Sequence, residues 1–387
     1  MEIVFWASLG FVTYVYAGYP LVLAVWSRLR GRPPRLGGAD LPHVSIVLAV
    51  RNEAARLSER LENLLALDYP SDCLEIVVAS DGSTDRTREV VAACSRAERA
   101  AGRRPPVRFV EIGRGGKAAA LNAGVAAARH DVLVFADARQ RFARDAVRKL
   151  VAPLADSKVG GVSGELVLDC ETGITDSTVR DGVGAYWRYE KWLRARESAI
   201  DSTLGATGAI YALRRACWHP LPDGTILDDV LAPMRAVLDG WRVVFEPAAR
   251  AFDVTAPNAV VESRRKTRTL AGNYQLVALE PRLLVPGVNR VWLQYVSHKI
   301  GRLLVPWALF AVLVATVMLA GSSPVYMLAA VAQALFYGMA LYGAYLERRG
   351  DARPATDGAT AGEISPRRPG LVRRQMERRV TRQQEAR

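Results

Sequence analysis

The sequence has little cysteine and little histidine, and neither residue type is clustered. The 387 residues contain four of each. The cysteines, Cys73, Cys94, Cys170 and Cys217, are far apart and show no C-x-x-C spacing. This pattern excludes the usual zinc motifs and a disulfide framework, so we expect reduced cytosolic thiols.

Charged residues are absent from three long apolar runs, residues 3–26, 303–320 and 325–346. At a helical rise of ~1.5 Å per residue, the first and third exceed a ~30 Å hydrocarbon core, and the second reaches it with its flanks. The first run is too long for a secretory signal peptide, follows Glu2 rather than a basic start, and precedes no small-residue cleavage site. The sequence therefore predicts three transmembrane helices.

Basic residues lie at one end of each apolar run. They are Arg28, Arg30, Arg32 and Arg35 after the first run, and Lys299, Arg302, Arg348 and Arg349 around the other two. Because basic loops stay on the cytoplasmic side, we expect a multi-pass protein of the cell (inner) membrane. Its N-terminus would be outside and the middle of the chain in the cytosol.

The net charge of +13 does not indicate a nucleic-acid partner. The sequence has no basic stripe interleaved with aromatic residues and no recognisable nucleic-acid-binding module. Positive-inside topology and contact with anionic membrane lipids explain the charge better.

Apolar runs and helical patterns alternate after the linker that contains Pro33 and Pro34. The expected strands are 44–50, 74–80, 107–112 and 131–137, and the expected helices are 53–65, 84–99 and 117–127. Short β-branched runs joined by helices are typical of a mostly parallel sheet in a Rossmann-like α/β domain. In such sheets, ligands bind beyond the carboxyl ends of the strands.

Polar and charged side chains follow each expected strand. They are Asn52 and Glu53, then Asp81, then Lys117, then Asp137 and Arg139. The carboxylates and amides could bond a base and a ribose, and the cations could face phosphate charge. The set indicates a nucleotide site.

The stretch "SDGSTDRT" places Asp81 and Asp85 four residues apart. Asp, Gly and Ser also favour turns and helix caps through local hydrogen bonds. These residues alone leave both interpretations open.

The chain resembles the membrane-bound family 2 glycosyltransferases, which include cellulose, hyaluronan and chitin synthases. The matching motifs, "RNEA", "SDGSTD", "GKAAALNAG", "DAR" and "LDD", fall in the family's order over residues 42–275. The resemblance implies a GT-A fold, a nucleotide-sugar donor, and Asp81 as a ligand of uridine or ribose, with Asp85 capping the next helix. It also implies that Lys117 and Asn122 line the donor site, although an Ala-rich helix with a solvated lysine is the alternative.

"DAR" departs from the family's Asp-x-Asp, whose carboxylates hold Mg²⁺ or Mn²⁺ on the donor diphosphate. Asp137 is retained, but Arg139 stands in place of the second Asp. Either the metal remains on Asp137 with phosphate oxygens and waters, or Arg139 takes over part of the charge neutralisation. We favour the first, because a cation bound mainly by phosphates needs only one or two carboxylates.

The acceptor side and the catalytic base are expected downstream. The resemblance places Thr207 and Gly208 of "GATGAIYALRR" at the acceptor, and Asp229 as general base supported by Asp228. A carboxylate opposite the leaving diphosphate can accept the proton of an attacking hydroxyl. A helix N-cap is the alternative for "LDD".

Two further segments bear on the acceptor and on processivity. "VGAYWRYEKWLRARES" offers Trp187 and Glu190 for acceptor binding, with core packing as the alternative for its aromatics. Polymerising members carry Q-x-x-R-W; here Arg268 occupies the Arg position on the donor side, and Thr269 replaces the Trp. The missing Trp makes processive synthesis doubtful.

The segment 281–302 shows an amphipathic pattern that suits a helix lying in the membrane interface, with a buried helix as the alternative. The predicted organisation is a membrane anchor at 1–27, a linker at 28–41, a GT-A domain at 42–280, an interfacial helix at 281–302, two transmembrane helices at 303–346, and a basic flexible tail at 347–387.

The expected activity is inverting transfer of a sugar, hexosyl or N-acetylhexosaminyl, from a nucleotide sugar, UDP-linked by preference. The acceptor would be a lipid-linked or glycan hydroxyl at the cytoplasmic membrane face. A processive polysaccharide synthase, which would need an oligomer or an export partner, is the enzymatic alternative. A catalytically dead sugar-nucleotide receptor is the non-enzymatic one, and a nucleotidyltransferase is a further option.

Overall fold

The computed structural model describes residues 1–37, 41–100, 102, 107–169, 177–254 and 259–351. The chain divides into two compact units, Met1–Ala330 and Val331–Arg387. The described part of the second unit is the continuation of helix α12 (Pro324–Asp351). Most of the predicted basic tail lies at residues 352–387, outside the described residues.

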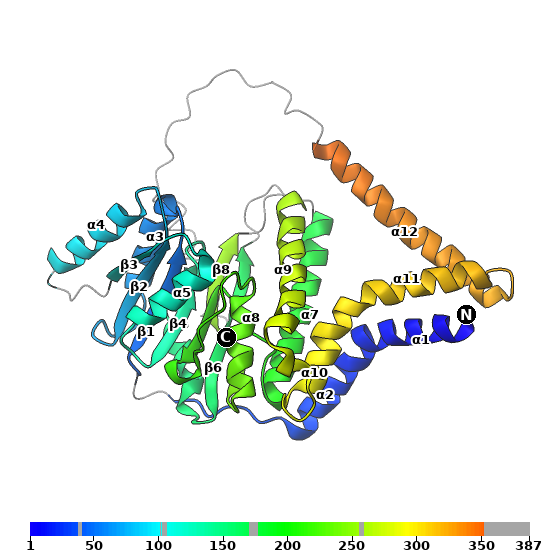
Figure 1. The fold of residues 1–387 in the computed structure, drawn as a ribbon, viewed down its shortest axis with the longest axis horizontal. Helices are drawn as coiled ribbons and strands as arrows, with labels where there is room; N and C mark the ends of the chain where they lie inside the picture. Colours follow the sequence, from blue (N-terminus) through cyan, green and yellow to red (C-terminus); the bar gives the residue numbers. More distant parts are fainter. Residues whose placement is uncertain (38–40, 101, 103–106, 170–176, 255–258, 352–387) are drawn as a thin grey trace, which may run out of the picture. The chain divides into compact units, whose positions relative to one another are not determined.

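The first unit contains one mixed sheet, whose described strands follow the order β3-β2-β1-β4-β7-β6-β8-β5 (Figure 1). The strands are β1 (Val44–Val50), β2 (Leu74–Asp81), β3 (Val107–Ile112), β4 (Val132–Ala136), β5 (Arg141–Phe142), β6 (Val159–Asp169), β7 (Ile210–Arg214) and β8 (Arg242–Val254). Strands β3, β2, β1 and β4 are parallel. Strand β7 pairs antiparallel with both β4 and β6, whereas β6 and β8 are parallel. The predicted α/β class is confirmed.

Helices cover both faces of this sheet (Figure 1). They are α3 (Ala54–Leu65), α4 (Thr87–Ala100), α5 (Gly116–Ala127), α6 (Ala146–Val151) and α8 (Asp228–Leu238). Leu57, Leu61 and Leu64, spaced along one side of α3, pack with α4 and α6 on one face. Helices α5 and α8 pack on the opposite face. The first four predicted strands match the observed bounds within one residue.

Helix α5 approaches the sheet closely at Gly124. A Cβ at this position would lie 2.6 Å from Cγ1 of Val47, so only glycine fits without displacing the strand. The small residue therefore lets α5 lie close against β1 and β2.

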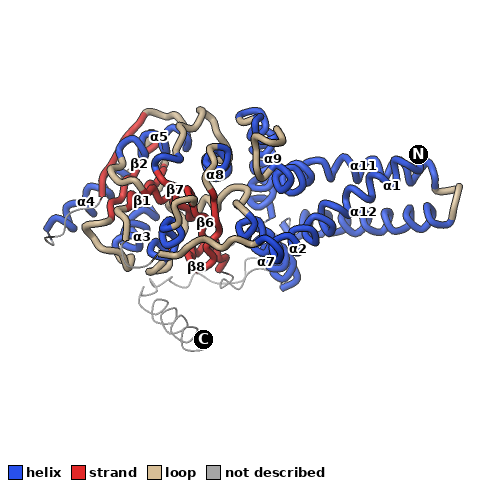
Figure 2. Tube along the Cα trace, turned by 90° about the horizontal axis from the view of Figure 1, so that it is seen from below, coloured by secondary structure: helices blue, strands red, loops and turns tan. Residues whose placement is uncertain are grey.

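Three helical stretches are long and apolar enough to cross a membrane, judged by length and composition: Glu2–Arg30, Trp292–Leu319 and Pro324–Leu346. The first comprises α1 (Glu2–Thr13), a π-helical turn (Tyr14–Gly18) and α2 (Tyr19–Arg30). Helix α1 lies beside α11 (Gly301–Leu319) (Figure 2). The ring of Phe5 packs edge-on against Tyr326 at the start of α12.

The segment 281–302 differs from the expected separate interfacial helix. It contains a 3₁₀ turn (Pro281–Leu284), a loop, a short helix α10 (Trp292–Gln294) and a π-helical turn (Tyr295–Ile300) that continues directly into α11. Gln294 and His298, expected on an exposed polar face, are buried. The reason is that partners from α7 (Ser177–Ile200) face this side, and periodicity within one segment cannot reveal them.

Within the first unit, helix α7 connects the sheet to the long apolar helices. Leu193 and Ile200 pack against Tyr19 and Leu23 of α2. The hydroxyl of Tyr19 donates to Oε1 of Glu197 at 2.7 Å, and Arg32 N donates to the Ala199 carbonyl at 2.6 Å. The end of the first apolar helical stretch is therefore held against the end of α7.

Candidate active site

The loops after β1 and β2 are tied together by Asn52. Its side-chain Oδ1 accepts from Thr84 N at 2.8 Å, and its backbone N donates to Oγ of Ser83 at 3.1 Å. Asn52 adopts a positive φ of 53°, a conformation that asparagine tolerates better than most residues. Asn52, predicted to lie in the donor site, thus also joins the loops that follow β1 and β2.

Asp81 connects the end of β2 to the glycine-rich loop after β3. Gly115 N and Gly116 N donate to its Oδ1 at 2.7 and 2.8 Å. Among the described residues, its Oδ2 has no protein partner, although the side chain is buried. Two backbone donors orient this carboxylate and leave one oxygen for a ligand.

Asp85 caps helices, as its position predicts. Its Oδ1 accepts from Thr87 N at 3.0 Å and from the Thr87 hydroxyl at 2.5 Å, at the start of α4. Its Oδ2 accepts from Ala54 N at 3.0 Å, at the start of α3. One exposed carboxylate therefore stabilises the N-termini of two helices.

Lys117 joins carboxylates that are far apart in the sequence. Its Nζ lies 3.1 Å from Oδ1 of Asp137, at the end of β4, and 3.2 Å from Oδ2 of Asp228, at the start of α8. Lys117 follows directly on Gly116, which holds Asp81. The predicted residues Asp81, Lys117, Asp137 and Asp228 are thus brought together at one edge of the sheet.

Asp229 faces the loop that precedes β7. Gly208 N donates to its Oδ2 at 3.0 Å, and Ala206 N donates to its backbone carbonyl at 2.7 Å. A Cβ at position 208 would lie 2.8 Å from Oδ2, so the close approach requires glycine. Its Oδ1 has no protein partner within the described part of the chain. The predicted base and the predicted acceptor loop are in direct contact.

Asp229 and Lys117 both have pKa values above their usual ranges, for different reasons. Burial raises the pKa of Asp229, and the charge of Asp228 raises it further against the effect of Lys117, to about 6. Burial would lower the pKa of Lys117, but the charges of Asp228 and Asp137 outweigh it and hold that pKa above its usual range. A carboxylate with a pKa near 6 suits proton transfer near neutral pH.

Arg139 does not join this cluster. Its Nη2 lies 2.9 Å from Oδ2 of Asp253 on β8, and Nε2 of Gln140 donates to the same oxygen at 3.0 Å. Arg139 therefore forms an ion pair with a buried carboxylate, that of Asp253. This pairing weakens the interpretation in which Arg139 neutralises a diphosphate.

The residues present fit a divalent cation that is bound mainly through a ligand's phosphates. The described residues include no group of three or more His, Cys, Asp or Glu side chains placed to hold a metal. Asp137 is a single, one-third exposed carboxylate whose Oδ2 has no protein partner among them. One or two carboxylates suffice for Mg²⁺ when phosphates supply the other ligands.

Two predicted donor residues hold loops in place. The side-chain amide of Asn122 makes two hydrogen bonds of 2.9 Å to the backbone of Leu221. Arg268 Nη2 donates to the Ile226 carbonyl at 3.3 Å, beside the "LDD" motif. The third, Glu53, forms an ion pair of 3.8 Å between its Oε2 and Nη1 of Arg56. Within the described part of the chain, its side chain does not contact the carboxylate cluster.

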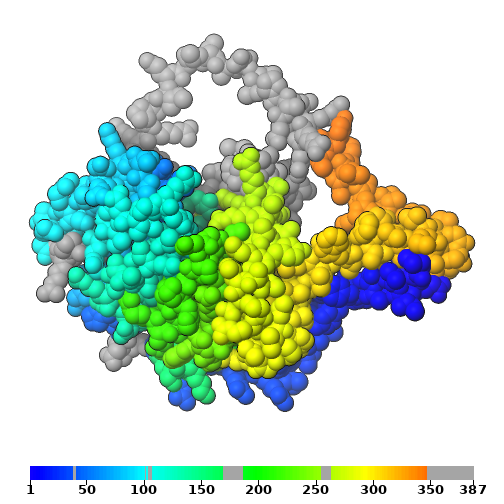
Figure 3. All heavy atoms as spheres, in the orientation of Figure 1, coloured from blue at the N-terminus to red at the C-terminus, as the bar shows by residue number. Residues whose placement is uncertain are grey.

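Helix α9 (Ala259–Leu279) covers the loop that leads into α8. Gln275 Oε1 accepts from Ile226 N at 2.9 Å, and a Cβ at Gly272 would lie 2.5 Å from Cγ of Leu227. In Figure 3 the green region of α8 lies between the cyan region of α5 and the yellow-green region of α9. The site therefore lies between α5 and α9.

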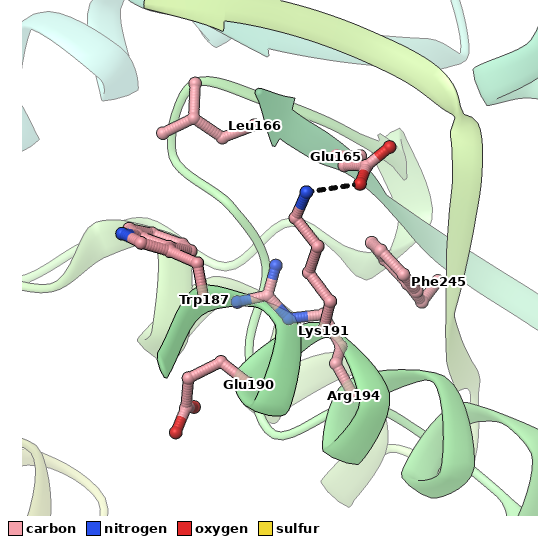
Figure 4. A pocket seen from close by; sticks show the side chains of 7 residues that line it. All are labelled: Glu165, Leu166, Trp187, Glu190, Lys191, Arg194 and Phe245. Carbon is pink, nitrogen blue, oxygen red and sulfur yellow. Dashed lines mark ion pairs between the residues drawn. The ribbon is translucent and has the colours of Figure 1, made fainter. Parts of the chain in front are cut away.

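Trp187 and Glu190 line one pocket beside the acceptor loop (Figure 4). Its other lining residues are Glu165, Leu166, Lys191, Arg194 and Phe245. Arg194 donates to Oγ1 of Thr207, so the pocket and the acceptor loop share a contact. Two of the predicted acceptor residues, Trp187 and Glu190, thus line the pocket, and a third, Thr207, is joined to it through Arg194. Gly208 follows Thr207 in the sequence.

The sequence interpretation missed two residues near the cluster. Arg194 was not assigned to the site, although one helical turn separates it from Glu190. Tyr211 on β7 is buried, its hydroxyl has no hydrogen-bond partner in the described structure, and its ring stacks on Phe135. Burial and the nearby charges of Asp228 and Asp229 raise the pKa of Tyr211 well above its usual value. An arginine four residues after Glu190 on the same helix was the available signal for Arg194, and no signal indicated Tyr211.

The strand order and the helices that cover the sheet are those of a GT-A fold. A family model described as "Glycosyl transferase family 2" matches residues 45–215. Residues 45–215 therefore carry a glycosyl transferase family 2 domain, and the predicted resemblance and GT-A fold are confirmed.

Similar proteins support this assignment. A mannosyltransferase from Pyrobaculum calidifontis, solved in complex with GDP-Man and Mn²⁺, is 26% identical with a TM-score of 0.67, over 85% of this chain and 90% of that one. A beta-monoglucosyldiacylglycerol synthase from Nostoc is 27% identical over 71% of this chain and 58% of its own. A poly-beta-1,6-N-acetyl-D-glucosamine synthase from Staphylococcus aureus is 30% identical over 64% and 58%. The chain spans little more than half the length of these curated relatives.

Proposed function

We propose that this protein is an inverting glycosyltransferase that moves a sugar from a UDP-linked donor to an acceptor hydroxyl at the cytoplasmic face of a membrane. The observation that carries the proposal is the cluster in which Lys117 bridges Asp137 and Asp228, with Asp229 beside them against the acceptor loop.

The donor's nucleoside would bind Asp81, whose Oδ2 remains available, beside Asn52. The diphosphate would lie near Lys117 and Asp137 at the ends of β3 and β4. A divalent cation, Mg²⁺ or Mn²⁺, would be held by Asp137 and would offset the negative charge of the leaving diphosphate. The neighbour from Pyrobaculum was solved with Mn²⁺ and a nucleotide sugar, which supports this choice of cofactor.

Asp229 would be the general base. Its Oδ1 accepts the proton of the acceptor hydroxyl while the hydroxyl oxygen attacks the anomeric carbon, and the bond from that carbon to the diphosphate breaks. A single displacement inverts the configuration and needs no protein nucleophile on the donor side. A base in contact with the acceptor loop favours an enzyme over a sugar-nucleotide receptor.

The acceptor would be a lipid-linked or glycan hydroxyl. The Nostoc relative is named for a diacylglycerol product, and the three apolar helices fit an enzyme that acts at a membrane. Thr269 in place of a Trp counts against processive synthesis, so we favour the addition of one or a few sugars.

The test is incorporation of label from a panel of radiolabelled UDP- and GDP-sugars by membranes containing the protein, with and without EDTA. Short lipid-bound product that requires a divalent cation is expected. High-molecular-weight product would favour a synthase. Activity unchanged by EDTA would contradict the metal assignment, and no incorporation from any donor would contradict the function.

For the metal, we expect Asp137→Asn to weaken Mn²⁺-dependent nucleotide binding. Isothermal calorimetry with UDP, with and without Mn²⁺, measures this without turnover. Glu59→Asn, an exposed substitution on α3, is the control.

A further inference from the structure

Two carboxylates, Glu165 and Glu190, line the pocket beside Thr207, and each contacts basic side chains of its own. Glu165 is bonded at 2.6 Å by Lys191 and at 3.3 Å by Arg250. Figure 4 shows Lys191 directed toward Glu165 across the pocket. Lys191 is therefore already paired with a carboxylate of the protein.

Glu190 is neutralised from the side of the membrane helices. Nη1 of Arg302 lies 2.5 Å and Nε2 of His298 lies 3.5 Å from its carboxylate oxygens. Burial would raise the pKa of Glu190, but its hydrogen bond with His298 and the charge of Arg302 lower it to about 2. Glu190 is thus ionised and paired at physiological pH.

Arg194 is the other basic residue that lines the pocket, and it takes no part in these ion pairs. Its Nη1 donates to the hydroxyl of Thr207, and its guanidinium lies 5.6 Å from the centroid of the Phe245 ring. Among the side chains that the structure describes, no carboxylate lies within ion-pair distance of Arg194. A guanidinium carries five N–H donors, so Arg194 retains donors for a ligand, while the charges of Glu190, Glu197, Asp229 and Glu165 act on it from a longer distance.

The position of Arg194 relates this charge to the proposed reaction. Thr207, its partner, precedes Gly208, whose N–H donates to Asp229. A ligand group bound to Arg194 would therefore lie close to the hydroxyl that Asp229 deprotonates.

The same pocket adjoins the membrane helices. Glu190 of its lining is bonded to Arg302 of α11, and Leu193, next to Arg194 in sequence, packs on Tyr19 and Leu23 of α2. The residues that line the pocket are thus joined directly to α2 and α11.

From these contacts we propose that Arg194 binds a phosphate group on a membrane-lipid acceptor and holds it while a neighbouring hydroxyl of that lipid is glycosylated. The inference rests on the proposed function and adds the acceptor class. Guanidinium binds phosphate through paired, charge-assisted hydrogen bonds, which a neutral lipid cannot offer.

The experiment compares two acceptors in phosphatidylcholine vesicles that contain the full-length protein. Phosphatidylglycerol carries a phosphate and free hydroxyls, whereas diacylglycerol carries a hydroxyl without the phosphate. The wild-type protein should transfer label to phosphatidylglycerol with the higher kcat/KM. Equal or better use of diacylglycerol would overturn the proposal.

The variant Arg194→Gln should raise KM for phosphatidylglycerol about 10- to 100-fold, the effect expected from losing a hydrogen bond to a charged group. Arg194→Lys should recover part of this loss. Arg188→Gln is the matched control, because Arg188 is exposed on the same helix. An unchanged KM in Arg194→Gln would overturn the proposal.

A binding measurement separates this inference from the function. Glycerol 3-phosphate should bind the wild-type protein more tightly than Arg194→Gln in calorimetry, and equal binding would overturn the inference whatever the transfer assay shows. Glycosylation of soluble glycerol 3-phosphate as efficient as that of phosphatidylglycerol would exclude the lipid as source of the phosphate. Failure of every nucleotide sugar to bind would instead contradict the proposed function.

Discussion

Asp229 shows how a single residue acquires a chemical role from its surroundings. Asp228 and Asp229 are adjacent, but Lys117 pairs with Asp228, while Asp229 accepts a backbone hydrogen bond and keeps one oxygen without a protein partner among the described residues. Burial and the charge of Asp228 raise the pKa of Asp229 above the usual range of a carboxyl. The sequence motif alone gave no means of distinguishing them by charge.

We expect Asp229→Asn to reduce transfer by roughly 100- to 10,000-fold, the usual contribution of a general base. Donor affinity should be nearly unchanged, because the proposed mechanism places Asp229 on the acceptor side. Initial rates and calorimetry with the nucleotide measure the two effects. Loss of nucleotide binding as well would contradict the assignment.

The pH dependence follows from the raised pKa of Asp229. The carboxyl must be ionised to accept a proton, so log kcat/KM should rise with pH up to about 6 and then level off. A pH profile measured under saturating divalent cation tests this. Persistence of the same inflection in Asp229→Asn would assign it to another group.

Gly208→Ala should lower kcat roughly 100-fold, the cost typical of a misplaced catalytic group. The added Cβ would lie 2.8 Å from Oδ2 of Asp229 and would displace the carboxylate. Steady-state kinetics and the nucleotide dissociation constant should show an effect on kcat alone. Gly321→Ala, which meets no atom within 4 Å, is the control. Wild-type kcat in Gly208→Ala would contradict the geometry.

At the scale of elements, loops after successive parallel strands are bonded to one another. Asn52 joins the β1 and β2 loops, and Asp81 joins the β2 and β3 loops. The strands and helices of this half follow from local periodicity and turn residues, so they were predictable to within a few residues. Strand β7 was not, because its antiparallel insertion between β4 and β6 depends on pairing across a long sequence separation.

Asp85→Ala tests the double helix cap. It should destabilise the protein by about 1 kcal/mol, the typical value for a lost N-cap. Hydrogen bonds from Thr87 are the largest cause lowering the pKa of Asp85. Its stabilising effect should therefore be complete above the carboxyl's unfolded-state pKa and should disappear as pH falls through the lower folded-state pKa. Thermal unfolding in detergent at several pH values measures this, with exposed Asp72→Ala as control. Equal melting temperatures for the two variants would contradict the capping role.

At the scale of the whole first unit, one buried network holds α7, beside the sheet, to the apolar helices α2 and α11. Glu197 on α7 accepts from Tyr19 of α2 and contacts Nδ1 of His298 at 2.7 Å. Glu190, two turns earlier on the same face of α7, contacts His298 and also lines the pocket beside Thr207. The pocket's position relative to the apolar helices is thus fixed by side-chain contacts rather than by a linker.

Glu197→Ala should destabilise this junction by about 1–3 kcal/mol, because the buried donors of Tyr19 and His298 lose their partner. The expected results are a lower melting temperature in detergent and faster tryptic cleavage at Arg30–Arg35, since Arg32 is anchored to the end of α7. Exposed Glu59→Ala is the control. Cleavage rates equal to those of the control would contradict the coupling.

The sequence by itself determined the elements that short-range physics controls: the apolar helices, the first four strands, and the polar residues that follow them. It also identified the carboxylates, because strand-end position and motif spacing are local properties. Only the tertiary structure decided the partners: Lys117 between Asp137 and Asp228, Arg139 with Asp253, His298 buried against α7, and Arg194 left without a carboxylate among the described side chains. Charged side chains choose partners by distance and burial in the folded chain, and neither quantity can be read from their spacing in the sequence.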